Sequence, residues 1–480
     1  MIAVCIAVPA VGAALLARAT GRLAVFLHAM TTVATVAVGV TVGVAAVRGA
    51  PALAVGGVLR VDALSGWMIL IIVTVAALAA VEAPRYVEAG APGTFYPLLH
   101  LMVFTMLLAV STDDIGVMWV AVEGTTLASV FLVNFERTRA SLEAAYKYLL
   151  ICSVGIALAF IGTVLVYYAD VLRQQAIGEH AAHALRWTAL LSLAPSLSPR
   201  VLEVAFVFLV VGYGTKAGLA PMHTWLPDAH SEAPAPVSAL MSGVLLSVGV
   251  YAVLRFKPIV DASVGPAFTQ RILSSLGLLS LGVAAVFLWA PRNYKRMLAY
   301  SSVEHIGLVC LGLGFGGPLG IAGALLHIAN HGLTKALLFL FAGRIRAAYG
   351  TADLAEVRGV LAALPYTGRA FFVALLALLG LPPFGLFTSE VMIFAAGFTS
   401  GHVWTAGAGL ALLVIAFGGL LRAAHGMLYG TAPDVVAGPA HHWLPAVPMA
   451  VALTLLVLTG LAWPPGLALA LDLAARVVMR

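Results

Sequence analysis

The sequence predicts an all-α polytopic membrane protein with about fourteen transmembrane helices. Of its 480 residues, 62% are hydrophobic and only 10% are charged, whereas soluble globular chains carry roughly 25% charged residues. Apolar runs of at least about 18 residues recur along the chain, and each is long enough to cross about 30 Å of hydrocarbon as a helix. The longest polar stretch, from Asp170 to Arg200, holds one short amphipathic piece. No segment is left that could form a soluble domain.

The positive charge of the chain indicates its topology. The formal net charge is +6, but the 26 Lys and Arg residues are scattered between spans, so they form no basic face that would bind nucleic acid. With the N-terminus outside, loops assigned to the cytoplasm carry more basic residues than external loops, among them Arg137, Arg292 and Arg346. The first span has no basic n-region, so we expect it to be retained. We expect a multi-pass protein of a prokaryotic cell membrane.

Cysteine usage argues against a cofactor or metal held by this chain. Cys5, Cys152 and Cys310 stand alone inside apolar runs, without a CxxC or other metal-spaced cluster. Gly312, Gly314 and Gly317 satisfy the GxGxxG spacing, but they lie between two spans and not at a strand-to-helix turn, so the match is accidental. We expect no metal and no bound cofactor in this chain.

Four predicted spans carry ionisable residues at membrane depth, where a charge costs at least about 2.5–3.5 kcal/mol on insertion scales. Glu123, Lys216 and Glu390 are each the only ionisable residue of a long apolar run. A fourth run holds several such residues at a spacing of four, which places them along one helix face. These are His327, His331 and Lys335. Structural pairing of buried charges is the alternative, but acid and base alternate between spans, which favours a relay.

Proline and glycine predict that two of these spans are broken. Pro221 and Pro227 follow Lys216, and Pro382 with Pro383 precede Glu390 in GLPPFGLF. Broken helices at membrane depth are tolerated where they line a protein cavity, and paired breaks about 160 residues apart indicate two repeats of five helices. Ordinary proline kinks are the alternative.

The chain resembles the antiporter-like subunits shared by respiratory complex I, multi-subunit cation/proton antiporters and membrane-bound hydrogenases. The resemblance extends from about Leu98 to Tyr429. Its most specific stretch is GYGTKAGLAPMHTWLPDAHSEAPAPVSALMSGVLLSVGVYAVLRF, supported by NYKRMLAYSSVEHIG, HIANHGLTKALLFLFAG and GLPPFGLFTSE. Among these relatives, the chain is most similar to the F-type component of hydrogenase-4.

The resemblance implies a fold and a set of roles. It implies one membrane domain, with helices 1–3 in residues 1–94, inverted repeats in 95–257 and 270–430 with helices 7 and 12 broken, and a last helix in 443–465. Glu123 on helix 5 would face Lys216 on helix 7. Lys335 on helix 11 would be the central relay lysine, and Glu390 on helix 12 the terminal exchange residue.

Two departures from the family pattern bear on the relay. Ser247 stands on helix 8 where many relatives have Lys or His, and a hydroxyl cannot store a proton. The bridge from Lys216 to Lys335 would then need water with His327 or His331, since imidazole titrates near neutral pH. Glu304 and His305 in SSVEHIG also differ from complex I relatives and resemble the hydrogenase-4 type. We count His223, Ser247, Glu304 and His305 as accessory relay candidates.

The resemblance implies that the chain translocates protons as one subunit of a larger redox complex. Its partners would be other membrane subunits and a hydrophilic arm that holds iron–sulfur clusters with nickel–iron or flavin, with a quinone site in a neighbouring subunit. A cation/proton antiporter without redox coupling is the first alternative, but no extra cluster of intramembrane acids marks a sodium site. An inorganic-carbon uptake module and a scaffold that has lost pumping are further alternatives.

Overall fold

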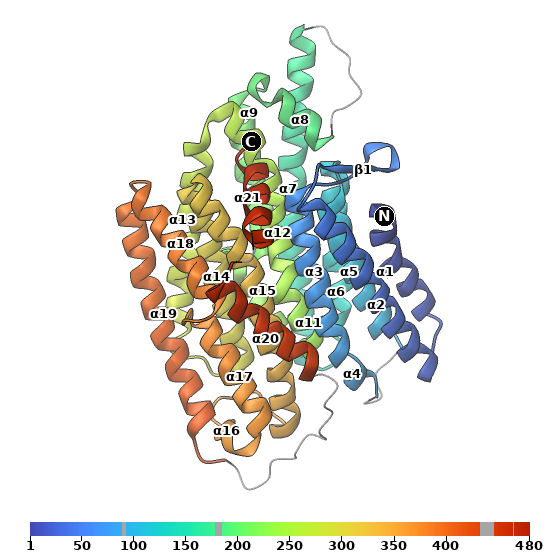
Figure 1. Ribbon diagram of the computed structural model, residues 1–480, viewed down its shortest axis with the longest axis vertical. Coiled ribbons are helices and arrows are strands. Elements are labelled where there is room, and N and C mark those ends of the chain that lie inside the picture. Colours follow the sequence, from blue (N-terminus) through green and yellow to red (C-terminus); the bar gives the residue numbers. More distant parts are fainter. Residues whose placement is uncertain (89–92, 178–184, 433–445, 464) are drawn as a thin grey trace.

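The computed structural model describes residues 1–88, 93–177, 185–432, 446–463 and 465–480. Apart from one short hairpin, the regular structure of these residues is helical (Figure 1). The hairpin pairs β1 (Ala52–Ala54) with β2 (Leu59–Val61) in antiparallel register. The helices of the N-terminal part are α1 (Ile2–Leu16), α2 (Gly21–Ala46), α3 (Ala63–Glu82) and α4 (Pro84–Glu88).

Two successive groups of helices follow, each with one interrupted span. The first group comprises α5 (Phe95–Ser111), α6 (Ile115–Val133), α7 (Arg139–Ile177), α8 (Trp187–Leu193), α9 (Pro199–Ala217), α10 (Trp225–Glu232), α11 (Ala235–Leu240) and α12 (Leu246–Val264). The second comprises α13 (Pro266–Phe287), α14 (Tyr294–Phe315), α15 (Gly317–Tyr349), α16 (Val360–Ala363), α17 (Pro365–Leu378), α18 (Gly385–Thr399) and α19 (Val403–Tyr429). We refer to residues 95–264 and 266–429 as the first and second halves.

The chain ends in two helices, α20 (Ala446–Leu461) and α21 (Pro465–Val478). They cross the front of the bundle, where Figure 1 shows them in red. The sequence predicted one helix over 443–465, of which residues 443–445 and 464 lie outside the described residues. Within the described part, that helix stops at Leu461, and Pro465 begins another helix after a sharp bend. Pro is favoured in the first turn of a helix, which accounts for the new start.

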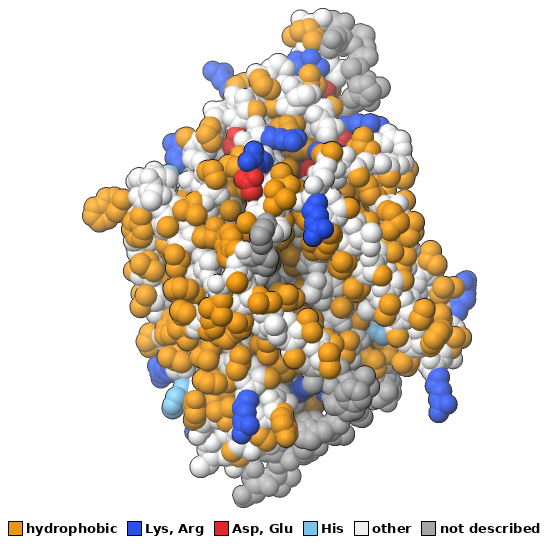
Figure 2. All heavy atoms as spheres, viewed as in Figure 1, with side chains coloured by type: hydrophobic (Ala, Val, Ile, Leu, Met, Phe, Trp, Pro, Cys, Tyr) orange, Lys and Arg blue, Asp and Glu red, His pale blue; other side chains and the backbone are white. Residues whose placement is uncertain are grey.

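Ten helices among the described residues are long and apolar enough to cross a membrane, and the bent pair at the C-terminus adds one more. Shorter apolar helices include Ile2–Leu16, Phe95–Ser111 and the two pieces of the interrupted span in the second half. This set is compatible with the fourteen crossings that the sequence predicts. Figure 2 shows hydrophobic side chains over the middle of one face, with Lys and Arg toward its two ends, as expected for a multi-span membrane protein.

The two interruptions lie where the sequence predicts them. In the first half, α9 ends just after Lys216, and Gly218 adopts a left-handed conformation (φ 77°) that ends the helix. A short 3₁₀ turn, η3 (Met222–Thr224), leads into α10. In the second half, α17 ends at Leu378 and α18 begins at Gly385, five residues before Glu390. The break therefore follows the ionisable residue in one half and precedes it in the other.

The helix after α10 connects the two halves. It runs through α11, a π-helical turn η4 (Met241–Leu245) and α12. Gly243 in η4 lies against Gly332 in α15 so closely that a Cβ on either residue would come within 3.0 Å of the carbonyl oxygen of the other. The absence of side chains at both positions permits this backbone contact.

A buried ion pair ties α12 to the N-terminal helices. Arg255 donates two hydrogen bonds to the carboxylate of Asp62, at 2.7 and 2.8 Å, and a third to Ser65 Oγ at 2.7 Å. Asp62 also accepts from Arg60. Burial alone would raise the pKa of Asp62, but Arg255 and Arg60 hold that pKa well below its usual range. Asp62 therefore stays ionised and keeps the start of α3 fixed to α12.

Candidate functional site

Lys216 lies in the last turn of α9, directly before the first interruption, and only 2% of its surface is exposed. Its Nζ donates to Thr126 Oγ1 and to the hydroxyl of Tyr148, both at 2.8 Å. The free carbonyl groups at a helix C-terminus also favour a cation there. The ammonium group is thus held by neutral oxygen acceptors at the end of a broken helix.

The structure brings Glu123 and Lys216 together, but through a bridge. Thr126 Oγ1 donates to Glu123 Oε2 at 3.1 Å while it accepts from Lys216, and Ser153 Oγ donates to Glu123 Oε1 at 3.3 Å. The resemblance implies that Glu123 faces Lys216, and the structure places Thr126 between them, with no ion pair between the two charges among the described residues. Thr126 lies one turn after Glu123 on α6, so its side chain reaches the space between them.

Lys335 occupies a different environment on the unbroken helix α15. It is fully buried, and its Nζ donates to the carbonyl oxygen of Leu298 at 2.7 Å and to Ser301 Oγ, both on α14. The next residue of α14, Ser302, shares a hydrogen bond of 2.7 Å with Ser242 in η4. Lys335 is therefore fixed to the helix that also contacts the connecting helix.

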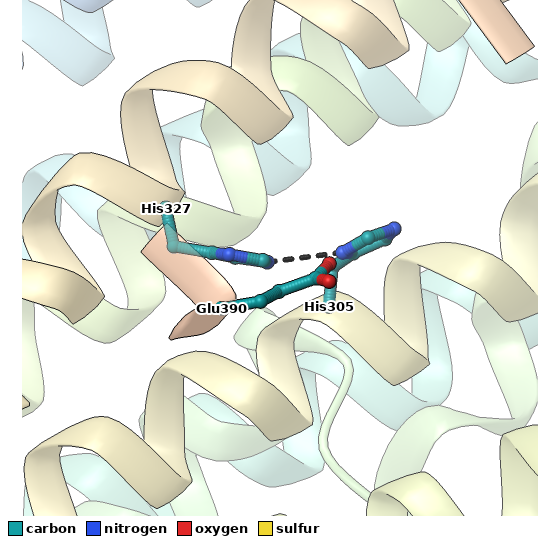
Figure 3. A group of neighbouring side chains, drawn as sticks. All are labelled: His305, His327 and Glu390. Carbon is teal, nitrogen blue, oxygen red and sulfur yellow. Dashed lines mark hydrogen bonds between the residues drawn. The ribbon is translucent and has the colours of Figure 1, made fainter. Parts of the chain in front are cut away.

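Two hydrogen-bonded imidazoles, His305 and His327, lie on the same two helices as Lys335 and its acceptors. Figure 3 shows His305 of α14 pointing at His327 of α15, with 2.9 Å between Nδ1 and Nε2. His327 Nδ1 lies 2.9 Å from Ser389 Oγ on α18, and that hydroxyl donates to the carbonyl oxygen of Leu386. In one consistent arrangement, each imidazole donates from Nδ1, and His327 accepts at Nε2. All three side chains are buried.

His331 extends this group toward Lys335. Its ring centre lies 5.3 Å from that of His305, while the ring of His327 lies 5.1 Å from His305 on the other side. His331 is fully buried, and neither of its ring nitrogens has a hydrogen-bond partner among the described residues. The predicted helix face of α15 is thus completed by His305, which comes from α14 and lies between the two histidines.

Glu390 and Glu304 line one cavity of about 340 Å³ beside the second interruption. Gly380, with φ 63°, lies so close that a Cβ there would come within 2.2 Å of Glu390 Oε2. Glu304, an accessory candidate of the sequence analysis, thus lies beside the same cavity as Glu390. Glu304 lies 86 positions away in the sequence, and only the packing of α14 against α18 brings the two carboxyl groups to the same cavity.

Three of these side chains could hold a metal ion. The nearest donor atoms of His305, His327 and Glu390 all lie within 4.8 Å of one another, and each side chain is buried. Two imidazoles and a carboxylate suit a divalent transition metal better than Mg²⁺ or Ca²⁺. The spacing of the three residues along the chain gives no hint of this donor set, because each comes from a different helix.

Two accessory candidates do not join the relay by direct contacts. His223 lies in η3, where its ring centre is 6.1 Å from that of Tyr300, and no hydrogen bond links it to Lys216 among the described residues. Ser247 follows the π turn and is fully buried, but its hydroxyl also has no partner among the described side chains. Ser242, one turn earlier, makes the hydroxyl contact to α14 instead.

Sequence reasoning missed several residues of the site. Thr126 and Tyr148 hold Lys216, and Ser301 holds Lys335. His230 on α10 is fully buried, its ring stacks on Phe339 with centres 5.0 Å apart, and neither ring nitrogen has a partner among the described residues. His230 stands within the LPDAH segment that carries the family resemblance, which is the one signal that could have selected it.

Comparison with known proteins identifies the family of this chain. Residues 112–416 match the family model described as NADH:quinone oxidoreductase/Mrp antiporter, TM. The chain belongs to this family. Its match thus includes both interruptions and the residues Glu123, Lys216, Lys335 and Glu390.

Individual members of the family agree with this assignment. The chain is 40% identical over 304 residues to a hydrogenase-4 component F homolog of Methylacidiphilum infernorum, which covers 63% of each chain. It is 34% identical over 342 residues to NADH-quinone oxidoreductase subunit N of Desulforudis audaxviator, covering 70% of this chain and 66% of that one. The matches thus span a little less than two thirds of these relatives' lengths.

A solved structure shares the whole fold. The chain superposes on a subunit of the membrane-bound sulfane sulfur reductase, an archaeal respiratory membrane complex, with a TM-score of 0.89. The superposition covers 100% of this chain and 98% of that subunit at 23% identity. The two chains therefore share one fold over their whole length.

Proposed function

We propose that this chain is the proton-translocating, antiporter-like membrane subunit of a redox-driven complex of the complex I or hydrogenase type. The observation that carries the proposal is the arrangement of Lys216 and Lys335, each buried among neutral oxygen acceptors and each adjoining groups that can exchange a proton. A buried ammonium without a paired carboxylate is readily deprotonated by a change in its surroundings. Such a group suits proton storage better than structural pairing.

The first half supplies a switch. Thr126 donates to Glu123 and accepts from Lys216, so a rotation of one hydroxyl breaks the hydrogen-bonded link between the two charged groups. Loss of that link in a low dielectric favours the neutral lysine and releases a proton. Restoration of the link favours the ammonium form, which reloads the site.

The second half supplies a proton path. From Lys335, the imidazoles of His331, His305 and His327 follow at ring separations of 5.1–5.3 Å, and they lead toward Glu390. An imidazole can accept a proton at one nitrogen and release another from the opposite nitrogen. Glu390 and Glu304 face the cavity beside the second interruption. A proton that reaches this cavity can leave the series of relay residues.

Redox energy would come from partner subunits. The names of the relatives include a hydrogenase component and a quinone oxidoreductase subunit, and we propose that iron–sulfur clusters, nickel–iron or flavin belong to a hydrophilic arm of the same complex. A quinone site would lie in a neighbouring membrane subunit. Purification in mild detergent with mass spectrometry of the associated subunits tests this, and a preparation without any redox protein contradicts it.

The central test is proton pumping by the intact complex in sealed vesicles. Lys216→Ala and Glu123→Ala should each abolish most redox-driven acidification while the complex still assembles, because each removes one end of the switch. Exposed Lys147 pairs with Glu143 and Asp228 at the surface, so Lys147→Ala is the matched control and should pump as the unmodified complex does. Normal pumping by Lys216→Ala contradicts the proposal.

A second function, exchange of a metal cation for protons without redox coupling, is favoured by the cavity that holds both Glu304 and Glu390. Two carboxyl groups beside the backbone of a broken helix are oxygen ligands that suit a sodium or potassium ion. Uptake of ²²Na⁺ by vesicles that hold the complex, driven by a pH gradient in the absence of electron donors, separates the two functions. Uptake that Glu304→Gln abolishes supports exchange, and no uptake supports pumping.

A further inference from the structure

A charged pocket of about 430 Å³ lies at the end of the bundle that carries α4 and the loop between α6 and α7. By the distribution of basic residues, this is the cytoplasmic end. The charges of its walls are largely paired, since Arg344 contacts Glu82 and Arg346 makes two hydrogen bonds to Glu136 at 2.9 and 3.0 Å. Lys295 also lines the pocket, and it forms no ion pair among the described residues.

Lys295 forms the inner wall of this pocket. Only 1% of its surface is exposed, and its Nζ donates to the carbonyl oxygens of Ser231 and Ala233 at 2.8 and 2.7 Å. These carbonyl groups belong to the C-terminal end of α10, which is the second piece of the broken span. Lys295 therefore connects a water-accessible pocket to the interrupted helix in the interior.

His230 lies on the same end of α10 that Lys295 contacts. It precedes Ser231 on α10, and neither of its ring nitrogens has a hydrogen-bond partner among the described residues. Its ring stacks on Phe339, one turn beyond Lys335 on the same face of α15. An imidazole thus stands between the lysine at the pocket and the lysine of the relay.

We propose that this pocket is the cytoplasmic entrance for protons and that Lys295 is the first group that carries them inward. Lys295, as an ammonium, gives one proton to His230, whose imidazolium passes one proton to the neutral amine of Lys335. Lys295 then regains a proton from a hydronium ion in the pocket, which leaves water. The inference rests on the proposed function, and it adds the place where protons enter.

The test uses an impermeant thiol reagent to block the pocket from the cytoplasmic side. Ala347 is exposed and lines the pocket, whereas the native Cys5, Cys152 and Cys310 are all buried. In vesicles with the cytoplasmic end outward, a bulky impermeant methanethiosulfonate reagent should therefore abolish most pumping by the intact Ala347→Cys complex. Ala17→Cys is the matched control, since Ala17 lines a separate pocket at the same end of the bundle, and its labelled complex should keep pumping.

A second variant tests the lysine itself. Lys295→Met should lose most pumping, while its melting temperature distinguishes loss of proton transfer from loss of the contact with α10. Unchanged pumping by labelled Ala347→Cys overturns the inference, even if Lys295→Met fails to assemble. If these variants pump normally while Lys216→Ala does not, only the entrance is wrong. If Lys216→Ala also pumps normally, the proposed function itself fails.

Discussion

The two halves of the molecule hold their buried lysines in different ways. In the first half, Lys216 ends a broken helix, and a single threonine hydroxyl joins it to a half-buried carboxylate. In the second half, Lys335 lies within an unbroken helix, and three imidazoles separate it from a carboxylate beside the break. A hydroxyl can only reorient, whereas an imidazole can hold a proton. On the proposed function, the first half would switch the charge of its lysine, and the second half would conduct protons.

Interrupting the imidazole chain should have the largest effect. His305→Gln retains a polar side chain but cannot be protonated, so we expect pumping to fall by about a hundredfold. His28→Gln is the matched control, because His28 of α2 is also buried and its Nδ1 lies 2.9 Å from Nε2 of a second histidine, His100 of α5. Vesicle acidification per electron transferred measures both variants. Equal loss in the two would show that burial, not conduction, explains the histidines.

Removing the bridging hydroxyl should have an intermediate effect. Thr126→Val keeps the shape of the side chain but removes hydrogen bonds to two charged groups, each worth roughly 1.5–3 kcal/mol. We expect pumping to fall by about tenfold or more, and Thr126→Ser should restore most of it. If Thr126→Val pumps normally, Glu123 and Lys216 communicate without the hydroxyl, and the first half is no switch.

The junction between the halves should be less sensitive. Ser242→Ala removes one neutral hydrogen bond to Ser302, worth about 1 kcal/mol. We expect no more than about a fivefold loss of pumping, because this contact holds α14 in place and carries no proton. A loss as large as that of His305→Gln would move the junction into the conducting chain.

A stability variant should change pumping least. Asp62→Asn leaves Arg255 buried without its counter-charge, which costs roughly 3–5 kcal/mol, so the melting temperature should fall. Exposed Asp472 pairs with Arg476, and Asp472→Asn should change little. Since the folded pKa of Asp62 is depressed, its contribution is complete above about pH 4 and constant from pH 5 to 8. Melting curves of purified complex at several pH values test this.

Much of the fold follows from local sequence, while half of the site does not. Apolar runs and prolines predict the spans and both interruptions, and a spacing of four predicts that His327, His331 and Lys335 share one helix face. The resemblance places Glu123 near Lys216. No local pattern shows that Thr126 stands between them, or that His305 lies between two histidines of α15, because helix packing decides both.

The same limit applies to two of the accessory candidates, Glu304 and Ser247. Glu304 and Glu390 share a cavity only because α14 and α18 pack together, so the sequence gives no sign of an acidic pair. Ser247 is predicted to face the relay, but the π turn before it inserts one residue into the helical repeat. Ser242, within that turn, makes the hydroxyl contact to α14, and the buried Ser247 hydroxyl has no partner among the described residues.

The contact between Gly243 and Gly332 has a mechanical consequence. Side chains elsewhere can change rotamer to absorb movement, but here backbone contacts backbone, so the two halves cannot come closer at this point without displacing whole helices. The π turn that contains Gly243 offers another movement. If it relaxed to an α-helical turn, the following segment would rotate by about 100°, and Ser247 would rotate with it. The contact between the halves therefore opposes their closer approach, while the π turn permits rotation of the helix that connects them.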